Sequence, residues 1–281
     1  MRKITFEQIA AMNMHYQKCS FEYFLESIDR LGVKNFELWA GSPHFCNTDS
    51  KASPVPKMKK MVADRGMKIV CVTPEQCLYP YNIAAREGHI RKRSIEYFNQ
   101  YVRQTAELGV DKMLITSGWG NYDERVQDAW NRSVESLREI LKTAEKEGVD
   151  LAFEILLPDE SNLVNNLETT IRMMKELESS RAKCCIDTVP VCFEGKTLDD
   201  FFKALGDKII HIHLNDGAPD GHLTWGDGEQ PLEEHLEALS RHNYAGYMTL
   251  ELGDPLYYLD PEKDLKRGLD TLKKVLPYEA K

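Results

Sequence analysis

Short, mostly apolar runs alternate with longer amphipathic runs along the chain of 281 residues. The spacing of the apolar positions predicts strands in the short runs and helices with one apolar face in the long runs. The predicted strands are Ile9–Met14, Asn35–Trp39, Lys68–Thr73, Lys112–Thr116, Asp150–Ile155, Lys183–Asp187, Lys208–Leu214 and Gly246–Leu252. The predicted helices are Phe21–Leu31, Pro56–Arg65, Arg91–Leu108, Glu124–Glu147, Leu167–Leu177, Leu198–Leu205, Leu232–Arg241 and Leu259–Leu272.

Glycines stand at the ends of four predicted helices, just before the next strand region: Gly32, Gly66, Gly109 and Gly148. This position is typical of a left-handed helix C-cap. Eight β–α units without a linker predict an α/β fold, a single (β/α)8 TIM barrel that forms one domain over residues 1–281. An open doubly wound sheet is the alternative, but the Gly-rich phosphate fingerprint often found after its first strand is missing.

Composition and charge narrow the class of protein. With 42% hydrophobic and 29% charged residues, the chain is typical of a soluble globular protein. No run approaches the roughly 18 apolar residues of a membrane span, and no apolar segment follows the basic N-terminal residues, so we expect neither a membrane partner nor a signal peptide. The net charge of −9 disfavours a nucleic-acid partner and fits an enzyme that acts on a small molecule.

The seven cysteines form no CxxC pair, and several lie in apolar runs. This usage favours reduced, buried thiols and a cytoplasmic location. A catalytic role for Cys185 is left open as the alternative.

The segment Ile209–Asp216 combines an apolar strand with two histidines and opens into a loop rich in Gly and Asp. His211 and His213 are two residues apart, so on a strand both side chains leave the same face. For either histidine alone, a hydrogen-bonded place in the core is the commoner role. A histidine at the C-terminal tip of a buried strand is also a common way to present a metal ligand.

Three other predicted strands end in a carboxylate at the matching place, which makes the set Glu154, Asp187, His213 and Glu251. Active sites of TIM barrels lie at the C-terminal ends of the strands. Burying four ionisable groups is very costly unless they share a counter-ion, and one divalent ion would serve all four. Each acid alone could instead cap a helix or loop, and Asp187 followed by Thr188 could simply cap a turn. Three carboxylates and one imidazole suit Mn²⁺, Mg²⁺ or Co²⁺, and Zn²⁺ accepts the same ligands.

The order Glu, Asp, His, Glu on the last four predicted strands resembles the xylose isomerase-like superfamily of TIM-barrel sugar isomerases and epimerases. That superfamily includes the tagatose/psicose 3-epimerases and endonuclease IV, and the resemblance covers nearly the whole chain. It is strongest to the fructoselysine 3-epimerase branch, in the segments FELWAGSPH, TPEQCLYPYN, FEILLPDESN, GDKIIHIHLND and GDGEQPL.

The resemblance implies a divalent-metal-dependent epimerase or isomerase that moves a proton next to the carbonyl of a ketose or amino-linked ketose, through a metal-bound enediolate. It implies that Glu154 and Glu251 both bind the metal and exchange the proton. Asp187 and His213 match the other two ligands, and Glu160 matches a glutamate that touches the hydroxyl end of the substrate. A metal site suits this chemistry, because a cation at the carbonyl oxygen stabilises the enediolate. Two glutamates also suit it, because inversion needs a base on one face of the carbon and an acid on the other.

The chain departs from these relatives in two ways. Endonuclease IV carries further histidines in regions that here read Val72–Glu75, Ile115–Gly118 and Asp187–Pro190, so most of a three-metal site is missing. Pro190 also replaces a histidine that contacts substrate in the free-ketose epimerases, which favours a substituted sugar over a free hexulose.

The element Asp220-Gly221-His222 matches an Asp-x-His element of endonuclease IV. Asp220 and His222 could hold a second cation or the substrate, or only order their loop. Trp39 is a candidate wall for a sugar ring, although such aromatics are as often core residues. Glu37 and Glu75 also lie near strand ends, but we set them aside because surface acids are common.

Three other functions stay open. One is a metal-dependent dehydratase of a cyclic polyol or keto acid, in which the same enediolate expels a hydroxyl group. Another is an endonuclease IV-like nuclease, which the absent histidines and the acidic charge disfavour. A non-catalytic sugar-binding protein is the third. A small-molecule sugar is the expected partner, and the resemblance also implies a homo-oligomer, either a dimer or a tetramer.

Overall fold

The computed structural model describes residues 1–47, 55–76 and 80–280. Its strands are parallel and form a closed barrel in sequence order, in which β1 pairs with both β2 and β8. The closed barrel confirms the predicted fold and excludes the open sheet. The strands are β1 (Ile9–Met12), β2 (Asn35–Ala40), β3 (Lys68–Pro74), β4 (Lys112–Ile115), β5 (Asp150–Glu154), β6 (Ala182–Asp187), β7 (Ile209–His213) and β8 (Met248–Leu250).

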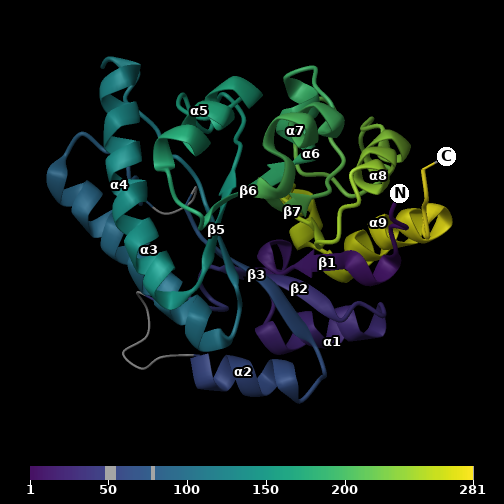
Figure 1. Ribbon diagram of the computed structural model, residues 1–281. Coiled ribbons are helices and arrows are strands. Elements are labelled where there is room, and N and C mark those ends of the chain that lie inside the picture. Colours follow the sequence, from purple (N-terminus) through teal and green to yellow (C-terminus); the bar gives the residue numbers. More distant parts are fainter. Residues whose placement is uncertain (48–54, 77–79, 281) are drawn as a thin grey trace.

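Helices surround the strands, from α1 and α2 at the bottom of Figure 1, through α3 and α4 at the left, to α5–α9 at the top and right. Each predicted helix corresponds to an observed one, whereas α6 and four short 3-10 helices were not predicted. The α-helices are α1 (Phe21–Arg30), α2 (Val55–Ala63), α3 (Gly88–Leu108), α4 (Val126–Glu147), α5 (Leu167–Leu177), α6 (Thr188–Phe193), α7 (Leu198–Leu205), α8 (Leu232–Arg241) and α9 (Pro261–Val275). The 3-10 helices are η1 (Phe6–Gln8), η2 (Met14–Tyr16), η3 (Gly206–Lys208) and η4 (Pro255–Tyr258).

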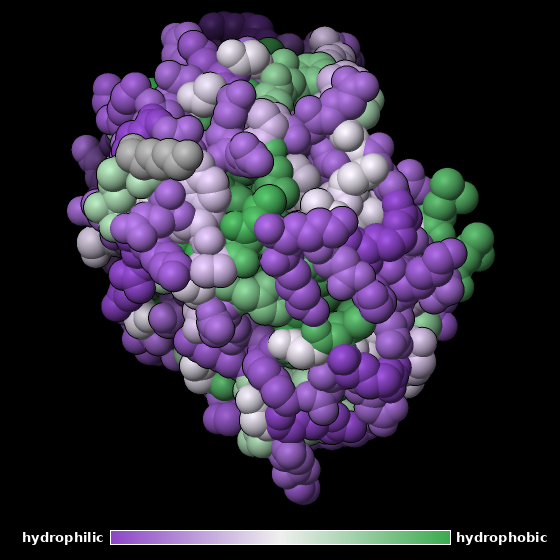
Figure 2. Space-filling model, turned by 90° about the vertical axis from the view of Figure 1, so that its right-hand side faces the viewer, coloured by the Kyte–Doolittle hydropathy of each residue, from purple (hydrophilic) through white to green (hydrophobic). Residues whose placement is uncertain are grey.

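Each long helix buries one face against the barrel. In α4, the buried residues Trp130, Val134, Leu137 and Leu141 recur every three or four positions, which places them on one side of the helix. The side of the molecule that carries α8 and α9 is mostly hydrophilic, with smaller hydrophobic areas near its centre and at the right-hand edge of the view (Figure 2). Among the described residues, no helix has the length and apolar character needed to span a membrane.

Both ends of the described chain lie on the same side of the barrel (Figure 1), where Ile4 and Tyr278 form an antiparallel bridge. The strands β1–β8 all run in the same direction around the closed barrel, so their C-terminal ends meet at one mouth of the barrel. That one domain spans residues 1–281 stays a prediction.

The four glycines predicted to end helices all adopt the left-handed conformation, with φ angles of 77° at Gly32, 59° at Gly66, 80° at Gly109 and 74° at Gly148. Gly109 is the C-cap of α3, and its N–H donates to the carbonyl oxygens of Ala106 and Thr105. These turns allow each helix to run directly into the following strand, as predicted.

We expect Gly109→Ala to destabilise the protein by about 1–2 kcal/mol, because a side chain makes the left-handed conformation strained even though no atom lies within 4 Å of the added Cβ. Thermal unfolding should then shift downward by at least about 2 °C. Gly88→Ala is the matched control, since Gly88 opens α3 with equally open space around its Cβ position and no positive φ. An equal loss of stability in both variants would contradict the explanation.

Candidate metal and substrate site

The four side chains predicted to share an ion lie together at the C-terminal mouth of the barrel. Strands β5, β6 and β7 end at Glu154, Asp187 and His213, and Glu251 directly follows β8. One ligand atom from each residue lies within 4.8 Å of the others. His213 Nδ1 lies 2.7 Å from an oxygen of Glu154, 2.7 Å from one of Glu251 and 3.7 Å from one of Asp187. These distances allow all four residues to reach one ion.

His213 gives a direct test of whether a divalent ion fits here. Its Nδ1 atom is buried and makes no hydrogen bond, although two carboxylate oxygens lie close to it. Lone pairs of one nitrogen and several oxygens that converge without hydrogen bonds between them are what a cation requires of its ligands. The residues present therefore fit a divalent ion.

The electrostatics of the cluster also favour a bound cation. Burial, together with the nearby charges of Glu251 and Asp187, raises the pKa of Glu154 to about 8. Burial favours a neutral imidazole at His213, but the nearby acidic groups of Cys185, Glu251, Glu37 and Glu154 outweigh it and raise the pKa of His213 above its usual value. Without a cation, protons therefore compensate the negative charge of the cluster.

Asp187 has two roles that the sequence presented as alternatives. Its Oδ1 atom accepts a hydrogen bond of 2.6 Å from the N–H of Val189 and so caps α6. Its Oδ2 atom faces the cluster and accepts from the side-chain amide of Asn215 at 2.8 Å. The cap fixes the carboxylate in the orientation that presents Oδ2 to the site.

Asn215 is a site residue that sequence reasoning missed. It is fully buried, and its Oδ1 atom accepts a 2.8 Å hydrogen bond from the N–H of Glu251, while its amide group donates to Asp187. Asn215 thus fixes the positions of Asp187 and Glu251 relative to each other. Its place two residues after His213, at the end of a buried strand, was the available signal.

Glu37 is a second site residue that the sequence does not identify. Setting Glu37 and Glu75 aside as common surface acids is wrong, since Glu37 is fully buried and Glu75 is only 4% exposed. The Glu37 carboxylate lies 2.6 Å from His211 Nε2 and 3.2 Å from His213 Nε2. Both histidines therefore face the barrel interior, as their spacing predicted. An acid flanked by Phe36 and Leu38 in an apolar run was the signal that could have identified it.

His222 and Glu160 lie beside the cluster. His222 Nε2 is 3.3 Å from Asp187 Oδ2 and 3.8 Å from Glu251 Oε2. Although burial opposes it, the charge of Asp187 raises the pKa of His222 to about 10 in the ion-free protein. Glu160 accepts a hydrogen bond from the N–H of Leu157, and burial raises its pKa above the usual value while the charge of His222 lowers it.

The side chain of Asp216 orders the loop that carries His222. Asp216 accepts hydrogen bonds from the N–H groups of Gly217, Gly226, Gly228 and Gln230, each at 2.9 Å. The main chain of Asp216 bridges that of Leu223, next to His222. This arrangement fixes the loop over the mouth of the barrel and explains why His222 reaches the cluster.

Two other candidate substrate residues are placed differently. The side chain of Asp220 is exposed, and within the described part of the chain the structure shows no contact between it and the four candidate ligands. Trp39 is only 2% exposed, and its indole N–H donates to Glu75 at 2.6 Å. Roles of Asp220 and Trp39 in substrate binding stay predictions.

The cysteines are free thiols at the six positions that the structure describes, and Cys77 lies outside the described residues. Cys185 is fully buried on β6, and burial raises the pKa of its thiol. A thiol that resists ionisation is a poor nucleophile, which argues against a catalytic Cys185.

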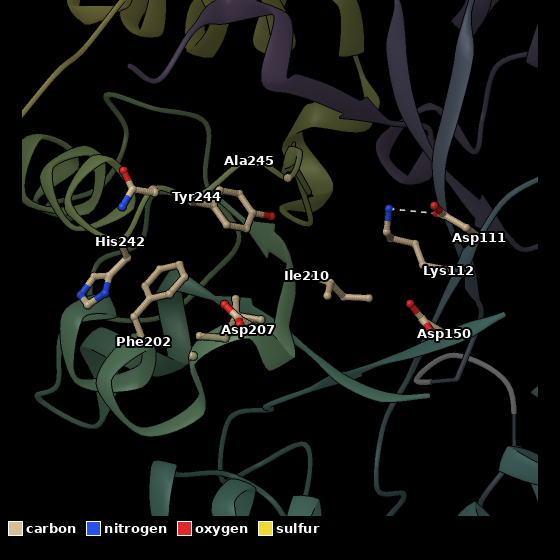
Figure 3. Close-up of a pocket in the computed structure, with 13 residues that line it drawn as sticks. Asp111, Lys112, Asp150, Phe202, Asp207, Ile210, His242, Tyr244 and Ala245 are labelled. Carbon is tan, nitrogen blue, oxygen red and sulfur yellow. Dashed lines mark ion pairs between the residues drawn. The ribbon is translucent and has the colours of Figure 1, made fainter. Parts of the chain in front are cut away.

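A cavity of about 480 Å³ lies at the opposite end of the barrel, where the strands begin (Figure 3). Lys112 at the start of β4 forms an ion pair with Asp111, and Asp150 at the start of β5 pairs with Arg181. None of the four candidate ligands lines this cavity. The N-terminal face of a TIM barrel contributes to stability, so we assign the chemistry to the other end.

Comparison with known proteins identifies the family to which the chain belongs. Residues 25–275 match a family model described as "Xylose isomerase-like TIM barrel". Over 264 residues the chain is 30% identical to a fructoselysine 3-epimerase of Escherichia coli O157:H7, covering 93% of this chain and 96% of that protein. Over 242 residues it is 24% identical to a D-psicose 3-epimerase of Ruminiclostridium cellulolyticum, covering 83% and 78%.

Among solved structures, the crystal structure of D-psicose 3-epimerase with D-tagatose from Clostridium cellulolyticum H10 superposes with a TM-score of 0.77. The match covers 96% of this chain and 99% of that chain at 20% identity, so it shows a shared fold. Together these comparisons confirm the resemblance that was drawn from the sequence.

We expect the affinity for a divalent ion to rise with pH between about pH 6 and pH 8. Binding requires an ionised Glu154 and a free lone pair on His213 Nδ1, and the pKa values of both residues are raised in the ion-free protein. Each displaced proton should change the affinity by roughly tenfold per pH unit. Titration calorimetry with Mn²⁺ in buffers of different ionisation enthalpy counts the released protons. A pH-independent affinity without proton release would contradict this account.

Proposed function

Because the chain belongs to the xylose isomerase-like TIM barrel family, we propose that it is a divalent-metal-dependent 3-epimerase of a ketose or an amino-linked ketose. One observation carries the proposal: Glu154, at the end of β5, and Glu251, directly after β8, flank His213 Nδ1 at 2.7 Å each. Two glutamates that converge from separate strands on one buried centre suit a reaction that needs a proton acceptor and a proton donor.

Glu154, Asp187, His213 and Glu251 would hold the ion, with Mn²⁺, Mg²⁺, Co²⁺ or Zn²⁺ as candidates. When bound, it would supply positive charge beside the carbonyl oxygen of the ketose and so increase the acidity of the neighbouring C–H group. Asn215 and the cap of α6 keep the carboxylates in place before substrate arrives. This reduces the reorganisation that the reaction would otherwise require.

The two glutamates then divide the proton transfer. One carboxylate removes the proton from carbon 3, which leaves an enediolate, and the other returns a proton to the opposite face of the same carbon. Which glutamate acts as the base depends on the configuration of the substrate.

Residues beside the cluster suit the rest of a sugar. His222 lies next to Asp187, and Glu160 is near enough to Asp187 and Glu251 for their charges to affect its pKa. Both side chains would offer polar groups to the hydroxyl oxygens of a substrate. The fructoselysine 3-epimerase similarity, together with Pro190 where free-ketose epimerases have a histidine, favours a ketose that carries an amino-linked substituent. A homo-oligomeric state stays a prediction.

We expect the Mn²⁺-loaded protein to convert fructoselysine to its 3-epimer in D₂O, with deuterium appearing at carbon 3. D-psicose and L-ribulose serve as free-ketose comparisons, measured by NMR. Exhaustive chelation should abolish the exchange, and added Mn²⁺ should restore it. Conversion that survives chelation, or a conjugated enone product in place of an epimer, would contradict a metal-dependent epimerase.

Replacing either glutamate by its isosteric amide should stop epimerisation. We expect Glu154→Gln and Glu251→Gln each to lower turnover at saturating Mn²⁺ by at least about 10²-fold, because one of the two proton-transfer groups is lost. Each variant should still exchange deuterium into one epimer but not the other, since the remaining carboxylate serves only one face. Glu168→Gln, an exposed acid on α5, is the control and should retain turnover. Near-normal epimerisation by either active-site variant would contradict the proposed roles.

A further inference from the structure

Glu37 lies behind the candidate ion site, in the interior of the barrel. It belongs to β2, and its carboxylate contacts residues from two other strands: Thr73 on β3, and His211 and His213 on β7. The Glu37 carboxyl group and both imidazole rings are fully buried. Burial of an isolated carboxylate is very costly, so such a group is kept only where it has strong hydrogen-bond partners.

The contact between Glu37 and His213 decides where the imidazole carries its proton. An ionised carboxylate can only accept hydrogen bonds, and a neutral imidazole has one N–H group and one lone pair. Both Glu37 oxygens lie 3.2 Å from His213 Nε2, so the proton belongs on Nε2. The lone pair is then left on Nδ1, the atom that faces Glu154 and Glu251.

The other contacts hold the Glu37 carboxylate in place. The hydroxyl of Thr73 donates to Oε1, and the Nε2 atom of His211 lies 2.6 Å from Oε2. The hydroxyl of Thr249 lies 3.0 Å from the same nitrogen of His211. The carboxylate therefore cannot turn away from His213 without breaking several buried hydrogen bonds.

We propose that Glu37 is a positioning residue that fixes the Nε2–H tautomer of His213 and thereby sets the affinity of the site for a divalent ion. The inference rests on the ion site of the proposed function, but not on the identity of the sugar. Carboxylate partners of this kind orient metal-binding imidazoles and increase their basicity, and their loss typically costs 10–100-fold in metal affinity.

Two other roles for Glu37 make different predictions. A purely structural buried pair would affect stability and leave ion affinity unchanged. Alternatively, Glu37 could itself be a ligand, since ligand atoms of Glu37, Cys71 and His211 lie within 4.8 Å of one another. The oxygens of Glu37 are already occupied by Thr73 and the two imidazoles, and burial raises the pKa of the Cys71 thiol, so a second ion is disfavoured.

The test compares Glu37→Gln with the wild-type protein. The amide keeps the shape of the side chain but removes the charge. Its NH₂ group is a hydrogen-bond donor, so it cannot accept from Nε2–H of His213 as a carboxylate oxygen does. We expect the affinities for Mn²⁺ and Zn²⁺, measured by competition with a chromogenic chelator at fixed pH, to fall by about 10–100-fold. Long-range ¹H–¹⁵N spectra of the Zn²⁺-loaded protein should show His213 protonated at Nε2 in the wild type and an altered pattern in the variant.

Glu75→Gln is the matched control, because Glu75 is also a buried acid, at the end of the β3 region, and accepts a hydrogen bond from Trp39 rather than from His213. It should retain the wild-type ion affinity. If Glu37→Gln fails to fold, Thr73→Val removes one hydrogen bond to Glu37 while the charge remains. We expect Thr73→Val to weaken ion binding by more than Glu75→Gln does, but by less than the decrease of about 10–100-fold expected for Glu37→Gln.

The outcomes separate the inference from the proposed function. If the wild type binds one ion and Glu37→Gln or Thr73→Val binds it equally tightly, the role of Glu37 is refuted and the epimerase proposal stands. If the wild type binds two ions and Glu37→Gln loses one, Glu37 is a ligand and the inference is wrong. If the wild type binds no divalent ion, both the inference and the proposed function fail.

Discussion

Three carboxylates converge on one imidazole nitrogen at the mouth of the barrel, and the repulsion among these buried charges is the constraint on which the site depends. Burial makes each negative charge costly, and proximity adds to that cost, so the pKa values of Glu154 and His213 are both raised. Positive charge must enter the cluster, either as protons or as a cation. Removal of a proton beside a carbonyl group also requires positive charge nearby. A cation that offsets the repulsion within the site would therefore also serve the proposed reaction.

Closure of the barrel is what brings these charges together. Asp187 pairs with His213 across β6 and β7, and Glu154 pairs with Cys185 across β5 and β6, so the ligands stand on adjacent strands at similar heights. Parallel strands direct all their C-terminal ends to this mouth, whereas the cavity at the other end is lined by residues where strands begin. The barrel thereby separates the end that holds the candidate chemistry from the end that contributes to stability.

Partners behind the ligands orient them. Asp187 is fixed by the N–H of Val189 and by Asn215, the main chain of Glu251 is tied to the same asparagine, and His213 is held by Glu37. Ligands held in this way lose little conformational freedom when an ion or a substrate binds. The cost of organising the site is met during folding.

Much of this protein could be predicted from its sequence, because the deciding signals are local. The period of apolar residues determined the strands and the longer helices, and a charged residue at the end of an apolar run identified the four candidate ligands. The six-residue helix α6 was missed because it is too short to show a period. Glu37 and Asn215 could not be assigned, since Glu37 meets His211 across 174 positions of the chain and Asn215 meets Glu251 across 36. Only the closed barrel decides such contacts, because hydrogen bonds and charge interactions depend on distance in space and leave no periodic pattern in the sequence.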